Sequence, residues 1–154
     1  MPLVLDSPAF APEHAIPAVY TCDGENLSPP LAWRDAPAGT RSFALIVDDP
    51  DAPSGTFRHW AIYNVAADAT GLAAGVERGP AGQGLGHGVN DFDHARYDGP
   101  CPPKGRGVHH YHFRLLALDV ERLSLPGDAS VVRVADAARG HVLAEAQLIG
   151  TYAR

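Results

Sequence analysis

Glycine and proline residues are spread along the whole chain and separate its apolar segments from one another. The 154 residues include 16 glycines and 14 prolines, and both residue types favour turns and disrupt regular helices. Long helices therefore have little room, whereas short strands fit between the interruptions. This spacing predicts an all-β protein whose apolar segments are strands.

The candidate strands are the apolar segments rich in branched or aromatic residues. They are Leu3–Leu5, Ser42–Asp48, Arg58–Val65, His109–Val120 and Val142–Tyr152. Because most of them are joined by long connections, a β-sandwich with crossing connections fits better than a meander. One helix is expected over Ser130–Arg139, with Ser130 as its N-cap and Gly140 as its stop. Gly71–Gly107 is predicted to be a long loop of the kind that often carries function.

Size and charge narrow the class of protein further. A chain of 154 residues, 45% of them hydrophobic, is expected to form a single domain over residues 1–154. The net charge of −6 and the scattered Lys and Arg residues argue against nucleic acid as a partner. The N-terminus MPLVLDSPAF lacks the pattern of a signal peptide, and no apolar segment approaches the ~18 residues that cross a membrane. A cytoplasmic location is therefore predicted.

Cys22 and Cys101 are the two cysteines of the chain. Two cysteines are too few for a disulfide framework, and they lack the CxxC spacing of zinc or redox sites. Whether they pair with each other is left open by the sequence.

The first candidate motif is DDPDAPSGTFRHW, residues 48–60. Asp48 and Asp49 end an apolar strand, so their carboxylates are expected at the edge of a sheet. Proline forces a turn at Ala52–Pro53, whose peptide bond is compatible with either a cis or a trans form. His59 follows Asp49 by ten residues on the next strand, where its ring could meet a carboxylate. The alternative is a solvated surface turn with a half-buried histidine.

The second candidate motif is RYDGPCPPKGRGVHHYHFRLLALD, residues 96–119. Side chains alternate along a strand, so His109, Tyr111 and Phe113 are predicted on one face and His110, His112 and Arg114 on the other. His109 and Tyr111 lie nearest the Gly/Pro-rich loop and would form the mouth of a pocket. The alternative for each histidine is a hydrogen-bonded core residue.

If the two motifs converge, one pocket combines Asp49, His59, His109 and Tyr111 with backbone amides of the GPCPPKG loop. Imidazole N–H, phenol O–H and amide N–H groups are donors, so the expected guest is an anion such as phosphate. Lys104 is the one Lys or Arg among the GPCPPKG loop and these pocket residues, which predicts weak binding. Asp49 would accept a hydrogen bond from an imidazole, fix its tautomer and favour the imidazolium form.

Two other chemistries use the same region. His59, His109, Asp49 and Asp51 could supply metal ligands, but no HExxH motif or cysteine pair supports such a site. The residues that could act as a nucleophile are Ser54, Thr56 and Cys101, and none lies in a GxSxG motif. No metal and no cofactor are therefore expected. An acid–base hydrolase stays an alternative to a binding protein.

Five segments give the chain a family resemblance. They are DPDAP with His59–Trp60, GPCPPKG with GVHHYHF, CDGENLSPPLAW, NDF at Asn90–Phe92, and AEAQLIGTY. Together they resemble the phosphatidylethanolamine-binding protein family, and in particular its bacterial branch, which is often described as Raf-kinase-inhibitor-like. The resemblance implies an antiparallel β-sandwich with Greek-key connections and a small anion pocket at one end. It also implies a homodimer.

The resemblance also implies a set of pocket residues and a function. The ligand-binding residues carried over are Asp49, Asp51, Pro53, His59, Gly99, Pro100, Pro102, Pro103, His109 and Tyr111. The implied function is that of a binding or regulatory protein for a phosphorylated small molecule, a phospholipid head group or a phosphorylated partner protein. Inhibition of a kinase or protease is the alternative that follows from the family.

Two departures from the family pattern limit this transfer. Asp93 follows NDF where bacterial members commonly have glycine. The resemblance therefore does not predict the path of that loop. The pocket-lining C-terminal segment of the animal members is missing, so their lipid preference and kinase partner do not carry over.

Overall fold

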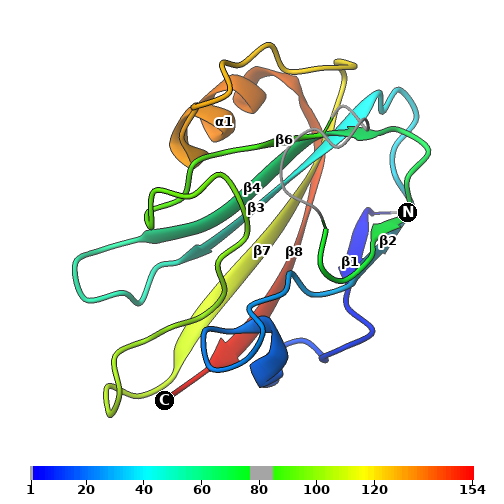
Figure 1. Ribbon diagram of the computed structural model, residues 1–154. Coiled ribbons are helices and arrows are strands. Elements are labelled where there is room, and N and C mark those ends of the chain that lie inside the picture. The colour runs from blue at the N-terminus through cyan, green and yellow to red at the C-terminus, as the bar shows by residue number, and fades with distance from the viewer. Residues whose placement is uncertain (1, 77–84) are drawn as a thin grey trace.

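Two antiparallel β-sheets form the fold (Figure 1). The computed structural model describes residues 2–76 and 85–154. The larger sheet has the strand order β6-β4-β3-β7-β8, and the smaller sheet has the order β1-β2-β5. The strands are β1 Val4–Asp6, β2 Leu31–Arg34, β3 Ser42–Asp49, β4 Phe57–Ala66, β5 Gly71–Leu72, β6 Gly86–His87, β7 His109–Leu118 and β8 Val142–Tyr152.

The larger sheet contains a Greek key. Strands β3, β4 and β6 lie side by side in chain order within this sheet, and β7 returns to pair with the free edge of β3. Spatial order 3-2-1-4 among four antiparallel strands is the Greek-key arrangement. The predicted antiparallel β-sandwich with crossing connections is thus confirmed.

The long strands were predicted to within two residues at either end, and Val142–Tyr152 matches β8 at both ends. Strands β2, β5 and β6 were not predicted. β2 has four residues and β5 and β6 have two each, which is too short for a recognisable alternation of apolar and polar side chains. The predicted loop Gly71–Gly107 therefore begins with β5 and contains β6. Part of that loop, residues 77–84, lies outside the described residues.

The main core lies between the two sheets. Strand β3 is central in the larger sheet and is buried along almost its whole length. Its residues Phe43, Leu45 and Val47 face the smaller sheet, where Trp33 packs with its ring centroid 5.2 Å from that of Phe43. This burial is the main source of stability for a sandwich.

Helix α1, Val131–Ala138, covers the other face of the larger sheet (Figure 1). Ser130 caps it as predicted, because the Ser130 hydroxyl accepts a hydrogen bond from the Arg133 N–H at 3.1 Å. The predicted stop at Gly140 is wrong. The α-helix ends at Ala138 and continues as a 3₁₀ turn, Arg139–His141, that leads directly into β8.

Two features left open by the sequence are resolved in the loops. Cys22 and Cys101 form a disulfide, which joins the loop after the 3₁₀ helix η1, Ala18–Tyr20, to the loop before β7. Within the described residues every peptide bond is trans, and this includes Ala52–Pro53.

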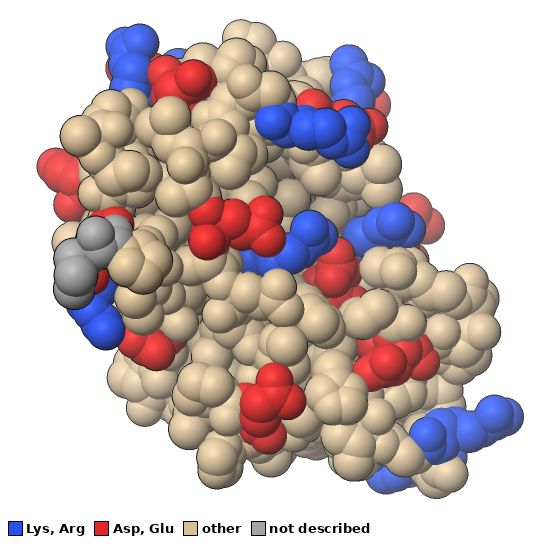
Figure 2. Space-filling view, turned by 180° about the vertical axis from the view of Figure 1, so that it is seen from behind, with Lys and Arg blue, Asp and Glu red and all other residues tan. Residues whose placement is uncertain are grey.

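The surface carries charges of both signs. On the face shown in Figure 2, Lys and Arg side chains lie scattered among Asp and Glu side chains and form no continuous basic patch. Among the described residues, no helix has the length and apolarity needed to cross a membrane.

Candidate functional site

A cavity of about 240 Å³ lies where β3 and β4 meet the loop before β7 and the first residues of β7. It is lined by Asp49, Ala52, Pro53, Ser54, Phe57, His59, Phe92, Cys101, Pro102, Pro103, His109 and Tyr111. The two sequence motifs therefore converge as expected. A larger hollow of about 370 Å³ beside Asn26 and Arg96 contains no histidine and borders Val76, where the described part of the chain breaks off.

Seven of the ten predicted pocket residues line this cavity: Asp49, Pro53, His59, Pro102, Pro103, His109 and Tyr111. The other three, Asp51, Gly99 and Pro100, hold the surrounding loops instead. The Asp51 carboxylate accepts hydrogen bonds from the backbone N–H and from the Nδ1 of His110, at 2.9 and 2.8 Å. These bonds hold the pKa of Asp51 below its usual value and fasten the turn after β3 to the outer face of β7.

Gly99 and Pro100 fix the loop before β7. The Gly99 N–H donates to Asn26 Oδ1 at 2.7 Å, and a Cβ at Gly99 would lie 2.0 Å from the Tyr20 carbonyl oxygen. The Pro100 carbonyl accepts a hydrogen bond from the Cys22 N–H at 3.1 Å. The three prolines of the GPCPPKG loop lack an N–H, and the Gly99 and Gly105 amides already have acceptors. The prediction that backbone amides of this loop bind a guest therefore depends on Cys101 and Lys104.

Asp49 orients His109, whereas the sequence suggested His59 as the ring that could meet a carboxylate. The distance from His109 Nδ1 to Asp49 Oδ2 is 2.7 Å, and both side chains are about 95% buried. The second oxygen of the carboxylate, Oδ1, accepts the Asp51 N–H at 2.8 Å. Asp49 meets His109 because β3 and β7 are paired neighbours, and these two residues end and begin those strands.

His59 reaches the cavity through a β-bulge. Val47 is paired with Trp60 and Asp48 with Arg58, so His59 is an extra residue on β4. Strict alternation would have placed it on the same face as Ala61, which packs in the helix-side core. The bulge instead turns the ring toward Tyr111, with the ring centroids 5.3 Å apart. Bulges frequently redirect side chains in this way at functional sites.

The partner of His59 is a backbone carbonyl. Its Nδ1 lies 2.8 Å from the Asp98 carbonyl oxygen. Burial lowers the pKa of His59 below the usual 6.5, against the opposing effects of the bond to Asp98 and of the carboxylates of Asp49, Asp98 and Asp91. His59 is therefore neutral near pH 7.

The Tyr111 phenol stays protonated and can donate a hydrogen bond into the cavity. Burial, together with the negative charges of Asp49 and Asp51, raises the pKa of its phenol far above the usual value. The ring packs between the two histidines, edge-on to His59 and stacked on His109 with a centroid distance of 6.4 Å.

Two phenylalanines form an aromatic wall that the sequence did not reveal. The ring centroids of Phe57 and Phe92 are 4.7 Å apart, and the Phe57 ring lies 4.9 Å from that of His59. Phe92 is part of the NDF segment, which was noted for its resemblance but was not assigned to the pocket. The residue after it, Asp93, has a φ of 64°, the left-handed region that glycine adopts most easily and Asp tolerates better than most residues. This explains why glycine suits that position.

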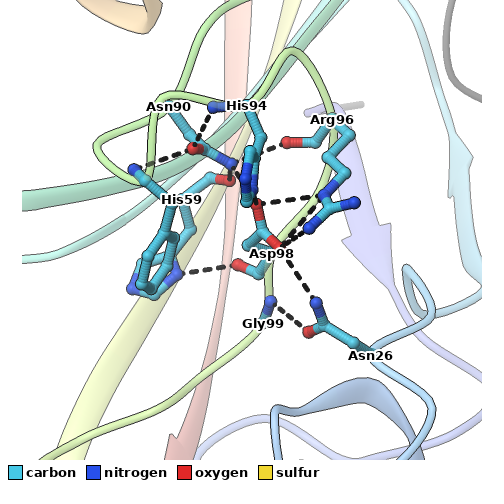
Figure 3. Close-up of polar contacts among 8 residues, drawn as sticks. Asn26, His59, Asn90, His94, Arg96, Asp98 and Gly99 are labelled. Atoms are coloured by element: carbon cyan, nitrogen blue, oxygen red, sulfur yellow. Dashed lines mark hydrogen bonds and ion pairs between the residues drawn. The ribbon is translucent and has the colours of Figure 1, made fainter.

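Asp98, which is itself buried, is the centre of a polar network next to the cavity (Figure 3). Its carboxylate accepts hydrogen bonds or ion pairs from Asn26 Nδ2 at 2.9 Å, Asn90 Nδ2 at 2.8 Å, His94 Nδ1 at 2.8 Å and Arg96 Nη2 at 3.1 Å. Burial alone would raise the pKa of Asp98, but the bonds from Asn90, His94 and Arg96 outweigh it and lower the pKa. This network was not predicted. Asn90, His94, Arg96 and Asp98 lie in one loop but match no known motif, and Asn26 joins them from 72 residues away.

Metal binding and nucleophilic catalysis were the other chemistries weighed from the sequence. Within residues 2–76 and 85–154, no group of three or more His, Cys, Asp or Glu side chains is arranged to hold a metal ion. Cys101 is bonded to Cys22 and so supplies no thiolate while the disulfide is intact. Ser54 lines the cavity and Thr56 does not. No described hydrogen bond links Ser54 to a histidine, as nucleophilic catalysis would need.

Comparisons with known proteins agree with this fold and with the sequence motifs. The family model described as phosphatidylethanolamine-binding protein matches residues 6–153. A UPF0098 protein of Methanothermobacter thermautotrophicus is 50% identical over 151 residues, which cover 97% of this chain and 98% of the relative. A UPF0098 protein of Aquifex aeolicus is 47% identical over 148 residues, covering 96% of this chain and 86% of the relative.

A solved structure gives the same result in three dimensions. The crystal structure of Escherichia coli YbcL, described as a new member of the mammalian PEBP family, superposes with a TM-score of 0.93 at 31% sequence identity, covering 100% of this chain and 99% of YbcL. The chain belongs to the phosphatidylethanolamine-binding protein family.

Proposed function

We propose that this member of the phosphatidylethanolamine-binding protein family is a binding protein whose cavity takes a small phosphate-like group. The observation that supports the proposal is the convergence of three polar atoms: the Nε2 atoms of His59 and His109 and the phenol oxygen of Tyr111. All three residues line one cavity. The three atoms have no hydrogen-bond partner within the described chain, and no polar side-chain atom there is both sealed from solvent and unpartnered. They are therefore available to a guest.

The chemistry of these atoms suits an oxyanion. Tyr111 donates a hydrogen bond, and His109, when protonated, keeps its ion pair with Asp49 and donates from Nε2 to the guest. Among the described residues, neither Lys nor Arg lines the cavity. Binding should therefore depend on geometry more than on charge, with a Kd on the order of millimolar for the bare anion.

The rest of the cavity suits an apolar substituent. Phe57, Phe92 and the prolines at positions 53, 102 and 103 form most of the lining. Apolar walls with a few well-placed polar groups are typical of small-molecule sites. A phosphomonoester or a phospholipid head group, with its oxyanion at the histidines and its carbon chain along these walls, fits both parts.

Several narrower expectations stay predictions. Inhibition of a kinase or protease and acid–base hydrolysis are alternatives to binding that no contact among the described residues favours, and homodimer formation is a further prediction. A cytoplasmic location must accommodate the Cys22–Cys101 disulfide, because disulfides are rare in the reducing cytosol of mesophiles, although intracellular proteins of hyperthermophiles do contain them.

NMR titration of the histidine side chains tests the binding proposal. Phenyl phosphate is added to the ¹⁵N-labelled protein, and the His59 and His109 signals are expected to shift at millimolar concentration. His109→Ala should weaken binding about tenfold, since it removes one of the three polar groups proposed to contact the guest.

His112→Ala is the matched control, because His112 lies on the same strand but faces outward and contacts Gln147. It should leave the affinity within about twofold. The proposal is wrong if neither His59 nor His109 shifts, or if both variants weaken binding equally.

A further inference from the structure

His59 is held so that its free ring nitrogen accepts a hydrogen bond. The Asp98 carbonyl oxygen can only accept, so the proton of the neutral ring must lie on Nδ1, at the 2.8 Å contact. Nε2 then carries a lone pair. A flip of the ring would replace this N–H···O bond by a C–H group facing the carbonyl, which leaves a buried acceptor unsatisfied.

The surroundings of His59 keep it neutral. The residue is 4% exposed, and its ring contacts the rings of Phe57, Phe92 and Tyr111. The carboxylates of Asp49, Asp91 and Asp98 favour the charged form, but burial outweighs them and lowers the pKa. Nε2 therefore stays an acceptor through the neutral pH range.

The Asp98 carbonyl is itself fixed in place. The Asp98 carboxylate is anchored by Asn26, Asn90, His94 and Arg96 (Figure 3). Asn90 Nδ2 also donates to the His59 carbonyl at 3.1 Å. The network thus holds both the backbone of His59 and the group that sets its tautomer.

The cavity therefore offers a donor and an acceptor to the same guest. Tyr111 donates, whereas His59 needs an O–H or N–H from the guest. A fully ionised oxyanion would leave one of its oxygens facing the His59 lone pair, and a protonated oxyanion would form a hydrogen bond there.

On the basis of the function proposed above, we infer that His59 is a specificity-determining residue that selects oxyanions carrying a proton. Such oxyanions include the phosphate monoanion and a monoprotonated phosphomonoester. His59 favours them over fully ionised tetrahedral anions such as sulfate. Asp98 is the positioning residue for this selection, because it acts through His59 and not on the guest.

Calorimetric titration with inorganic phosphate and with sulfate at about pH 6, where much of the phosphate is the monoanion, tests the inference on the full chain. Phosphate is expected to bind more tightly than sulfate by about tenfold or more. Phosphate gains a hydrogen bond to His59, whereas sulfate places an oxygen against the same lone pair. His59→Gln should reduce this preference to within about twofold, because an amide can present either its N–H or its oxygen. His112→Ala should keep the full preference.

The two proposals fail in different ways. Equal binding of phosphate and sulfate by the wild-type protein overturns the inference about His59 and leaves anion binding intact. Absence of binding for both anions overturns the proposed function and the inference together.

A ligand-free measurement gives an independent test. The ¹⁵N chemical shifts of the His59 ring between about pH 6 and 8 are expected to show an unprotonated Nε2 and a protonated Nδ1. A protonated Nε2 in this range overturns the inference whatever the titrations show.

Discussion

The cavity has two histidines that look equivalent in the sequence but are held in different ways. On the His109 side, formed by His109, Asp49 and Tyr111, the partner of the imidazole is a carboxylate on the adjacent strand, 2.7 Å away. On the His59 side, formed by His59, Asp98 and the side chains that bind Asp98, the partner is a backbone carbonyl on a loop, 2.8 Å away. Both rings use Nδ1 for this contact and leave Nε2 for a guest.

The difference teaches that the orienting partner decides what a histidine can offer. A carboxylate forms an ion pair with a protonated ring and so permits Nε2 to donate. A neutral carbonyl in a buried site fixes the neutral tautomer and makes Nε2 an acceptor. Two histidines in one cavity are thus oriented by different chemical groups, a carboxylate for His109 and a backbone carbonyl for His59.

Removal of the disulfide should have the largest effect on stability and should disturb both sides. Cys101 belongs to the loop that runs from Asp98 to His109, and the bond to Cys22 closes a sequence separation of 79 residues. Chain-entropy arguments predict that Cys22→Ser combined with Cys101→Ser lowers the free energy of unfolding by about 4 kcal/mol. Urea denaturation measures this loss, and a reducing agent should destabilise the wild type but not the double variant. A loss below about 1 kcal/mol would show that other contacts hold the loop.

Removal of the Asp98 carboxylate should break the His59 side alone. Asp98→Ala leaves Asn26, Asn90, His94 and Arg96 without their common acceptor, and we expect the free energy of unfolding to fall by about 3 kcal/mol. In urea denaturation, Asp51→Ala is the control, since Asp51 bonds one partially exposed histidine and should cost less than about 1 kcal/mol. Similar losses for the two variants would contradict a central role for Asp98.

Neutralising Asp49 should disturb the His109 side and lower the affinity of the protein for phosphate. Asp49→Asn keeps an oxygen that can accept from His109 Nδ1 but removes the negative charge that balances a protonated ring. Phosphate affinity measured by calorimetry should fall about tenfold, or ~1.4 kcal/mol. Asp48→Asn is the matched control, because Asp48 pairs with Arg114 on the outer face of the sheet. If Asp48→Asn weakens binding as much as Asp49→Asn, the effect is not specific to the cavity.

The smallest expected effect is a pH dependence of the free energy of unfolding that comes from His59. Because the folded pKa of His59 lies below the unfolded value of 6.5, the unfolded chain binds more protons as the pH falls through that value. His59 therefore contributes stability above pH 6.5 that is lost progressively in acid. Urea denaturation between about pH 7 and 5 should show a steeper loss for the wild type than for His59→Gln. Equal slopes would mean that burial does not suppress protonation of His59.

Much of the His109 side could be read from the sequence because it depends on regular strands. Alternation along His109–Leu118 placed His109, Tyr111 and Phe113 on the inner face, and the structure confirms this assignment through their burial. The Ser130 cap and the ends of β8 were predictable for the same reason, since they follow from local patterns of side chains and turns. The resemblance of whole segments supplied the Greek key, which no local pattern specifies.

The His59 side depends on contacts that no local pattern encodes. The bulge that turns His59 inward is a mismatch between β3 and β4, so it exists only in the pairing of the two strands. The Asp98 network joins Asn26 to a segment 72 residues away, and the aromatic wall brings Phe57 onto Phe92. Strand periodicity reports which residues share a face, because neighbouring peptide units determine it. Only the tertiary structure shows that His109 is bound by Asp49 and His59 by the Asp98 carbonyl. These partners are distant in sequence, and the distances between them exist only after the sheets and loops have packed.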